Sequence, residues 1–569
     1  MFERILPFLP MAYLASMIAA LISVIVIGIV PTPLEILADS GSAAALLRSL
    51  CAFFMPLAFT LFLGVSWRGA QFWALVLIMG ALMVLTAPLP ANAAIATAAY
   101  LLWKDMLPST PAETALTSWS GLLWWIVGII AFTFALRLLA LDEPFERDLM
   151  AYSMVASSWL QGAELYSETW GHKPPALYVV YASAIAVLGQ SPVALLALGI
   201  GAFVATLLGI KVAAERLAGP GAALLAMLAW AVFGNDLILQ AQQPNVEVFI
   251  SACLIWALAV LIPVARDPDA NGAILLAGGL FFLASAFKQI AVFPAVLAGI
   301  WLLWLHLRTF RQDGRSHLIS GIRAGALLAL PGLLGWAVIV FSFAAFGDFE
   351  EFWYGAFGYN QSYAGSVLFN MLWTALRDVR DPYYIAVFLG LILLCTTFRD
   401  RRVAILMASA YIGCAVMVAA PGKNFPHYYQ LLLPVMAVGY GAHMATFVPA
   451  GKRVVAALLT LAPIWISFGY FTSPERLAYV KYGERGHGGA SVESREIGRW
   501  ISRNVPPEQT VFHWGAEPGV YFWSGRPTEY RFVYNYPLFG GPRRDEFLGD
   551  VLTELACDPP DVVVPESVS

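Results

Sequence analysis

Charged residues are scarce in this 569-residue chain, and their scarcity excludes an ordinary soluble fold. Asp, Glu, Lys and Arg together make up 12% of the residues, whereas soluble domains contain about 25%. Hydrophobic residues make up 60%, and the mean hydropathy is +0.72. This composition predicts an all-α polytopic membrane protein.

Cysteine and the common nucleotide-binding motifs are also lacking. The chain has five cysteines, and no two of them stand in a CxxC spacing, so neither a disulfide framework nor a zinc site is indicated. No GxxxxGK[ST] or HExxH pattern occurs, and no GxGxxG signature with its acidic residue is present. We therefore expect neither a nucleotide cofactor nor a nucleic-acid partner. An activated donor would have to arrive through the membrane.

Long apolar runs are abundant, and a helix that crosses a bilayer needs about 20 such residues. About fifteen runs qualify, with 90–103 short enough to be re-entrant instead. They are 9–30, 46–66, 70–88, 90–103, 119–141, 193–212, 220–238, 247–264, 272–287, 290–306, 324–346, 383–398, 403–420, 429–447 and 454–471. With the N-terminus inside, most Lys and Arg residues of the short loops fall on the cytoplasmic side. The loops 142–175, 239–247 and 348–382 then face outward, together with the chain after Thr472.

Two changes in composition divide the chain into three parts. Residues 1–104 form an apolar appended N-terminal transmembrane module, which a polar linker separates from the rest. Residues 119–471 form the main transmembrane domain. Hydropathy falls in 472–569, where the short runs TVFHW and YRFVYNY suggest strands. We expect this last part to be a small α/β domain outside the membrane.

The segment 141–178 carries many ionisable residues between two apolar runs. Such groups beside membrane spans are costly and usually functional. They are Asp142, Glu143, Glu146, Arg147, Asp148, Glu164, Glu168, His172 and Lys173. Asp142 and Glu143 directly follow a span, so one of them could accept a proton from an attacking hydroxyl. An ordinary interfacial carboxylate pair is the alternative, with Arg137 as a candidate ion-pair partner.

Basic residues recur at the outer ends of other spans. Pro174 and Pro175 fix the chain direction after His172 and Lys173, and a lysine ammonium suits a phosphate. Snorkelling to the interface is the alternative for Lys173. Lys288 interrupts the apolar run 272–306 and therefore lies at a turn. Its side chain faces either an outer site shared with Lys173 or the lipid headgroups.

Two further outer segments carry polar or aromatic side chains. The loop 235–247 ends in Asn245 and Glu247, whose side chains suit sugar hydroxyls or a divalent cation with oxygen ligands. A plain solvated loop is the alternative. His427 and Tyr428 follow Lys423, and they belong either to an interfacial aromatic belt or to a clamp on a phosphate or sugar.

The order of these motifs resembles a known family. Asp-Glu after a span is followed by Gly162 to Tyr166, Lys-Pro-Pro, a polar second loop, an outward lysine, and His-Tyr-Tyr before a helix with Pro434. This order resembles the GT-C membrane glycosyltransferases, in the bacterial protein-mannosyltransferase and aminoarabinose-transferase-like branch. The resemblance covers roughly 119–540 and leaves 1–104 outside. The fifteen apolar runs then divide into about eleven core spanning helices and about four N-terminal ones.

The resemblance also implies site residues. Asp142 would be the catalytic base, and Lys173 and Lys288 would hold the donor phosphate. Glu247 occupies the place of the family's acidic residue in the second loop. Together with the residues singled out above, the expected substrate-binding set is Glu143, Arg147, His172, Lys173, Asn245, Glu247, Lys288, His427 and Tyr428. A divalent metal cation is allowed, with Asp142, His172 and Glu247 as its candidate ligands. One departure is that His172 stands where aminoarabinose transferases carry Glu, which argues against lipid A aminoarabinose specificity and against a carboxylate-only metal site.

The expected reaction is transfer of a sugar from a polyprenyl-phosphate donor to a hydroxyl by single displacement with inversion. The acceptor would be an envelope glycan, a lipid or a protein. The protein would lie in a bacterial inner membrane with its active site facing the periplasm. A transporter or flippase for lipid-linked glycans is one alternative, and a glycan polymerase or ligase is another. Charges gathered at one face rather than at the midplane favour an enzyme over a transporter.

Overall fold

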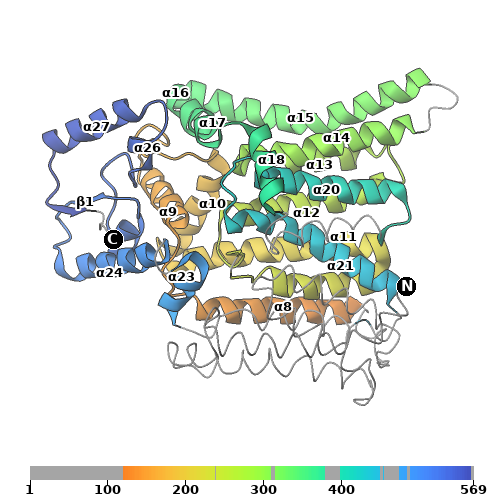
Figure 1. Ribbon diagram of the computed structural model, residues 1–569, viewed down its shortest axis with the longest axis horizontal. Helices are drawn as coiled ribbons and strands as arrows, with labels where there is room; N and C mark the ends of the chain where they lie inside the picture. Colours follow the sequence, from red (N-terminus) through yellow and green to blue (C-terminus); the bar gives the residue numbers. More distant parts are fainter. Residues whose placement is uncertain are drawn as a thin grey trace, which may run out of the picture.

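The computed structural model describes residues 119–565, apart from 238, 309–313, 379–396, 449–452, 454–472 and 484–486. The appended module 1–104 lies outside the described residues, as do the predicted span 454–471 and nearly all of 383–398. The described part is a bundle of long helices with a smaller C-terminal region at one end (Figure 1). The prediction of a helical polytopic membrane protein is confirmed, because five described helices are long and apolar enough to cross a membrane.

The long apolar helices run side by side along the bundle (Figure 1). They are α8 (Trp119–Leu139), α11 (Pro192–Phe233), α12 (Val246–Val264), α13 (Asn271–Phe287), α14 (Val292–Leu307), α15 (Gly314–Phe346), α20 (Arg401–Ala419) and α21 (Leu433–Phe447). Short 3-10 helices lead into two of them, η3 (Gln289–Ala291) before α14 and η5 (Pro426–Leu432) before α21. The predicted spans in this part of the chain match these helices within a few residues at most ends.

The helix α11 is a hairpin of two helical segments rather than one rod. Ala218 and Gly219 leave the helical conformation, with Gly219 at φ 83°, and Pro220 then restarts the helix. The two segments lie against each other, because the Trp230 indole stacks on Phe203 with 5.5 Å between ring centroids and donates a hydrogen bond to its carbonyl. The break agrees with the two separate spans predicted at 193–212 and 220–238.

Shorter helices build the end of the bundle next to the C-terminal region. They are α9 (Arg147–Leu160), α10 (Pro175–Leu188), α16 (Phe349–Trp353), α17 (Tyr359–Ala364) and α18 (Val367–Asp378), with the π-helical turn η4 (Tyr354–Gly358) between α16 and α17. Ten of the fourteen residues of α9, Leu149 to Ser158, are buried. The middle of the charged segment 142–175 is therefore a packed helix rather than a solvated connection.

The C-terminal region combines helices with two short strands. It contains α23 (Pro474–Tyr482), α24 (Gly488–Asn504), β1 (Val511–Trp514), α25 (Gly519–Ser524), α26 (Tyr536–Phe539), α27 (Arg544–Cys557) and β2 (Val562–Pro565). The strands pair in parallel, with Val511 opposite Val562 and Trp514 opposite Pro565. The run TVFHW is thus a strand, as predicted.

The run YRFVYNY does not form the predicted strand. Its backbone bonds to loops instead, since the Trp170 amide donates to the Arg531 carbonyl and the Asn535 amide donates to the Gly515 carbonyl, at 2.9 and 3.0 Å. Its aromatic side chains Phe532 and Tyr534 are buried against Trp170. Contact with the loop before α10 has overridden the β propensity of the run, and this contact joins the C-terminal region to the bundle.

Candidate active site

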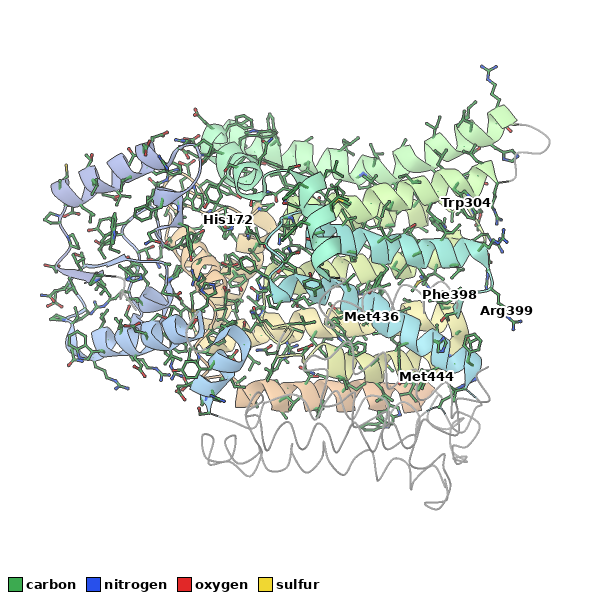
Figure 2. The ribbon with its side chains drawn as sticks, viewed as in Figure 1. His172, Trp304, Phe398, Arg399, Met436 and Met444 are labelled. Carbon is green, nitrogen blue, oxygen red and sulfur yellow. The ribbon has the colours of Figure 1, made fainter. Side chains whose placement is uncertain are left out.

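A cavity of about 630 Å³ lies where the bundle meets the C-terminal region. Its walls come from the start of α9, the loop before α10, η5, α23 and the segment around α26. Charged and aromatic side chains dominate the lining, which includes Glu146, Arg147, Asp148, His172, Lys173, Tyr359, Lys423, His427, Tyr428, Lys481, Tyr482, His487, Tyr534 and Tyr536. His172 lies at this junction in Figure 2. The cavity thus joins segments that are far apart in the sequence.

Asp148 is the partly buried carboxylate in the first turn of α9. The Glu146 side chain caps this helix by accepting a 2.9 Å hydrogen bond from the Asp148 amide. The Tyr152 hydroxyl, one turn further on, donates to Asp148 Oδ2 at 3.3 Å. Burial alone would raise the pKa of Asp148, but the positive charges of Lys173 and Arg147 outweigh it and lower the pKa. Asp148 is therefore ionised and able to accept a proton.

Asp142 does not line the cavity. Its side chain is 57% exposed and pairs with Arg499 and Arg495 of α24, the latter at 3.7 Å. This placement corrects the expectation that Asp142 is the catalytic base. The chain makes a turn after α8, and the next helix begins only at Arg147, so the carboxylates of this segment that line the cavity are Glu146 and Asp148, four and six residues further on. Glu146 caps α9, which leaves Asp148 as the candidate base. The candidate base moves from Asp142 to Asp148.

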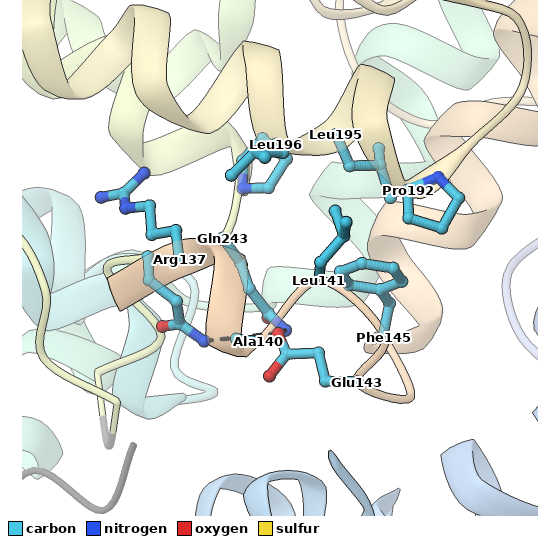
Figure 3. Close-up of a pocket in the computed structure, with 11 residues that line it drawn as sticks. Arg137, Ala140, Leu141, Glu143, Phe145, Pro192, Leu195, Leu196 and Gln243 are labelled. Atoms are coloured by element: carbon cyan, nitrogen blue, oxygen red, sulfur yellow. Dashed lines mark hydrogen bonds between the residues drawn. The ribbon is translucent and has the colours of Figure 1, made fainter. Parts of the chain in front are cut away.

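Glu143 is buried behind the cavity rather than in it. Its carboxylate pairs with Lys481 and accepts a 2.7 Å hydrogen bond from Gln243, and Figure 3 shows Glu143 and Gln243 side by side. Arg137, the candidate ion-pair partner of Asp142 or Glu143, reaches the second outer loop. It donates instead to the Asn235 side chain and to the Gly234 carbonyl, at 3.2 and 2.8 Å. These residues therefore organise the second outer loop.

His172 and Lys173 line the cavity together. Lys173 Nζ lies 2.7 Å from His172 Nε2, and His172 Nδ1 lies 2.8 Å from the Tyr534 hydroxyl. Burial lowers the pKa of His172 well below 6.5, and the neighbouring charge of Lys173 lowers it further, so the ring is neutral. An ammonium can only donate hydrogen bonds. Nε2 is therefore the acceptor, and Nδ1 carries the hydrogen that bonds to Tyr534.

Glu247 and Lys288 form a buried ion pair next to the cavity. Lys288 Nζ lies 2.8 Å from Glu247 Oε1 and 3.9 Å from the centre of the Tyr428 ring. Tyr428 and His427 line the cavity, whereas Glu247 and Lys288 do not. Burial lowers the pKa of His427 below 6.5. The structure thus places Glu247, Lys288, His427 and Tyr428 in one cluster.

Two other predicted binding residues have different surroundings. Arg147 lines the cavity and pairs with Glu517 at 3.0 Å, and its side chain also contacts His487. Asn245 is buried just before α12, where its side chain donates to Gln240 at 3.2 Å. Arg147 is therefore available to a bound molecule, whereas Asn245 shapes the loop.

The residues proposed to hold a metal do not fit one. Asp142 pairs with arginines, Glu247 pairs with Lys288, and both ring nitrogens of His172 already have partners. Within the residues that the structure describes, no three His, Cys, Asp or Glu side chains come close enough to hold an ion. The metal set Asp142, His172 and Glu247 is thus not brought together.

Several cavity residues were missed by the sequence analysis. Asp148 stood in the charged segment, and its spacing of four from Tyr152 was the one signal that could have selected it. Lys481, Tyr482 and Tyr534 lie more than 300 residues further along the chain. Nothing in their local sequence marks them as cavity residues, because they reach it only through the docking of the C-terminal region.

Comparisons with known proteins add structural neighbours. No protein-family model matches the chain, and no curated protein sequence matches it. The structure is similar to ArnT from Cupriavidus metallidurans bound to undecaprenyl phosphate, with 15% identity, a TM-score of 0.49, and 78% of this chain and 95% of that chain covered.

Another neighbour is the Archaeoglobus fulgidus oligosaccharyltransferase. One structure, tethered to an acceptor peptide that contains the NVT sequon, has 11% identity and a TM-score of 0.47, with 74% of this chain and 65% of that chain covered. Its complex with Zn and sulfate has 12% identity and a TM-score of 0.43, with 72% and 62% covered. In both cases the chain spans less than two thirds of the length of that protein.

Proposed function

We propose that this chain is a glycosyltransferase of the GT-C type that uses a polyprenyl-phosphate sugar as its donor. The sugar passes to a hydroxyl on an envelope glycan, a lipid or a protein, by a single displacement that inverts the anomeric centre. The observation that carries the proposal is that an ionised carboxylate, Asp148, and the buried cation Lys173 line one cavity beside the membrane helices. A base and a phosphate anchor are the two groups that this transfer requires.

The chemistry follows from the positions of these groups. The acceptor oxygen attacks the anomeric carbon while its proton moves to Asp148. The bond between the anomeric carbon and the phosphate oxygen breaks, and the electron pair leaves with the polyprenyl phosphate. Lys173 stabilises the charge that develops on the departing phosphate, and Lys423 and Arg147 line the same cavity. A phosphate is a good leaving group, so no separate strong acid is needed.

The distribution of basic residues supports an outward-facing cavity. Arg308 caps the C-terminus of α14, and Arg402 lies in the first turn of α20. The two helices meet there, because the Trp301 indole donates a hydrogen bond to the Arg402 carbonyl. Figure 2 shows Arg399 at the far end of the helix bundle from His172, which lies where the bundle meets the C-terminal region. Since arginines concentrate in cytoplasmic loops, the cavity would face the periplasm of a bacterial inner membrane.

The test compares two aspartates that differ in their position relative to the cavity. Purified protein in lipid nanodiscs receives a polyprenyl-phosphate sugar and candidate acceptors, and release of free polyprenyl phosphate is measured. We expect Asp148→Asn to lose turnover by about two to four orders of magnitude, the usual worth of a general base. Asp142→Asn is the matched control and should keep most of the activity. Equal activity in the two variants would contradict Asp148 as the base.

The same preparation separates transfer from transport. In vesicles, a flippase would move intact lipid-linked sugar across the bilayer without releasing polyprenyl phosphate. Movement without release, unaffected by Asp148→Asn, would overturn the proposed transferase and favour transport.

A further inference from the structure

The short helix α18 has two sides of opposite character. Its outward side consists of four large apolar side chains that are each more than half exposed: Leu368, Phe369, Leu372 and Trp373. They form two pairs spaced four residues apart, so they share one side of the helix. Asn370 and Thr374 lie on the other side and make hydrogen bonds within the protein. An exposed apolar surface of this kind usually contacts a membrane or another protein.

The position of α18 in the bundle favours the membrane. The Asn370 side chain donates to the carbonyl of Ala420, directly after the last residue of α20, whereas Arg401 and Arg402 begin α20 at its other end. Figure 1 shows α18 running crosswise to the long helices α15 and α20. A helix that runs crosswise to the spans lies in the plane of the membrane surface, where its apolar side can enter the lipid.

The inward side of α18 holds the short segment that carries Lys423. Asn370 donates to the Ala420 carbonyl at 2.9 Å, and the Thr374 hydroxyl donates to the Asn424 side chain at 2.8 Å. Thr374 and Asn424 are both buried. Lys423 lies between the two contact points and lines the cavity. The hydrogen bonds of α18 therefore determine where the backbone of Lys423 lies.

Gly422 shows how closely α18 approaches this segment. Its φ is 68°, in the left-handed region that favours glycine. A Cβ at this position would lie 2.5 Å from the side chain of Asn370, which is closer than any real contact. The segment before Lys423 is thus packed directly against the polar side of α18.

We propose that α18 is a membrane-surface helix whose apolar side docks into the outer leaflet, and that Asn370 and Thr374 are positioning residues for Lys423. The part that concerns Lys423 rests on the proposed function and deepens it. The phosphate of a polyprenyl-phosphate donor lies at the level of the lipid headgroups, and so does a helix docked in this way. Docking of α18 would therefore hold Lys423 at the depth where the donor phosphate arrives.

The first experiment identifies what covers the apolar side of α18. The five cysteines are replaced by alanine, and Phe369→Cys then carries a nitroxide in purified protein in nanodiscs. Oxygen concentrates in lipid and a nickel chelate stays in water, so we expect oxygen to relax this label more than nickel does. Asp545→Cys is the aqueous control, because the Asp545 side chain in α27 is 87% exposed, and its label should respond mainly to nickel.

The second experiment tests whether α18 acts through Lys423. Asn370→Ala and Thr374→Val each remove hydrogen bonds to the segment, and the affinity for undecaprenyl phosphate is measured in nanodiscs. We expect each variant to bind about three- to tenfold more weakly, as for the loss of a hydrogen bond. In a Lys423→Ala background the same changes should weaken binding by less than about twofold, because residues that act together are not additive.

A matched control separates this effect from a general loss of folding. Ser342→Ala removes a hydroxyl that donates within α15 to the Val338 carbonyl, and it should bind undecaprenyl phosphate as the wild type does. Thermal unfolding of every variant shows whether it is folded. If Asn370→Ala does not fold, Thr374→Val carries the comparison, because valine keeps the shape of threonine.

The two experiments can each overturn part of the inference. A label at position 369 that responds to nickel as strongly as the label at 545, or that is shielded from both agents, would overturn docking into lipid. Equal weakening with and without Lys423 would overturn the positioning role, since a merely structural effect is additive. Failure of the wild type to bind undecaprenyl phosphate would instead count against the proposed function, and the nitroxide result is independent of it.

Discussion

Lys481 forms an ion pair with Glu143, and the two side chains are 0% and 2% exposed. The pair joins α23 to the end of α8, across more than 300 residues of sequence. Gln243 extends the contact, since its side chain donates to Glu143 at 2.7 Å and accepts from the Tyr482 hydroxyl at 2.7 Å. Lys481 and Tyr482 also line the cavity, so this cluster fixes the part of its wall that α23 supplies.

Removing one member of this pair should loosen the C-terminal region. In Lys481→Met, Glu143 would keep a buried charge without its cation, and a change of this kind costs about 3–5 kcal/mol of stability. We expect lower thermal stability in detergent and faster proteolysis near α23. The double variant Glu143→Gln/Lys481→Met has no buried charge left and should recover most of the loss. A single variant that unfolds at the wild-type temperature would contradict this account.

The pH dependence of donor use should reflect Lys173. Burial lowers the pKa of Lys173 to about 8, and an ammonium is charged only below its pKa. The kcat/KM for the donor, which reports the free enzyme, should therefore be constant below this pH and fall by about tenfold per unit above it. The pKa of Asp148 is lowered, so the base stays ionised throughout this range. The measurement is a profile of kcat/KM from pH 6 to about pH 10.

Lys173→Arg provides the control for that profile. A guanidinium stays protonated up to a pH above about 12, so the fall in kcat/KM above pH 8 should disappear even if the overall rate drops. A profile that keeps the same alkaline limb in this variant would assign the limb to another group.

The fold could be predicted from the sequence to a large extent, because bilayer-length apolar runs leave few alternatives to helices. The spans 119–141 and 247–264 correspond to α8 and α12. The run YRFVYNY shows where this reasoning ends. Its alternation favoured a strand, but the run follows the surface of the loop around Trp170, and such a tertiary contact has no local signature.

The candidate site could be predicted only in part. The sequence located Lys173, His427 and Tyr428, because charged or aromatic groups at the outer ends of apolar helices are unusual. It selected Asp142 over Asp148, since both carboxylates lie in the same segment and only the start of α9 decides which one reaches the cavity. Tyr534 could not be found, because its role depends on a contact 362 residues away from its partner His172.

The break inside α11 should depend on one glycine. Gly219 adopts φ 83° and ψ −175°, a conformation that only glycine adopts without strain. Gly219→Ala should therefore cost about 1–3 kcal/mol of stability, even though a Cβ at this position would meet no atom within 4 Å. The control is Gly201→Ala, in the first segment of the same hairpin, where a Cβ also meets nothing within 4 Å but the backbone is helical.

That control should be neutral or stabilising by about 0.5–1 kcal/mol, because alanine favours a helix more than glycine does. Thermal unfolding of both variants in the same detergent measures the difference. Because open space surrounds both positions, a loss of stability confined to Gly219→Ala can come only from the backbone conformation that turns the chain between the two segments. Equal unfolding temperatures would show that α11 can continue through residue 219, and the contact between Trp230 and Phe203 would then need another cause.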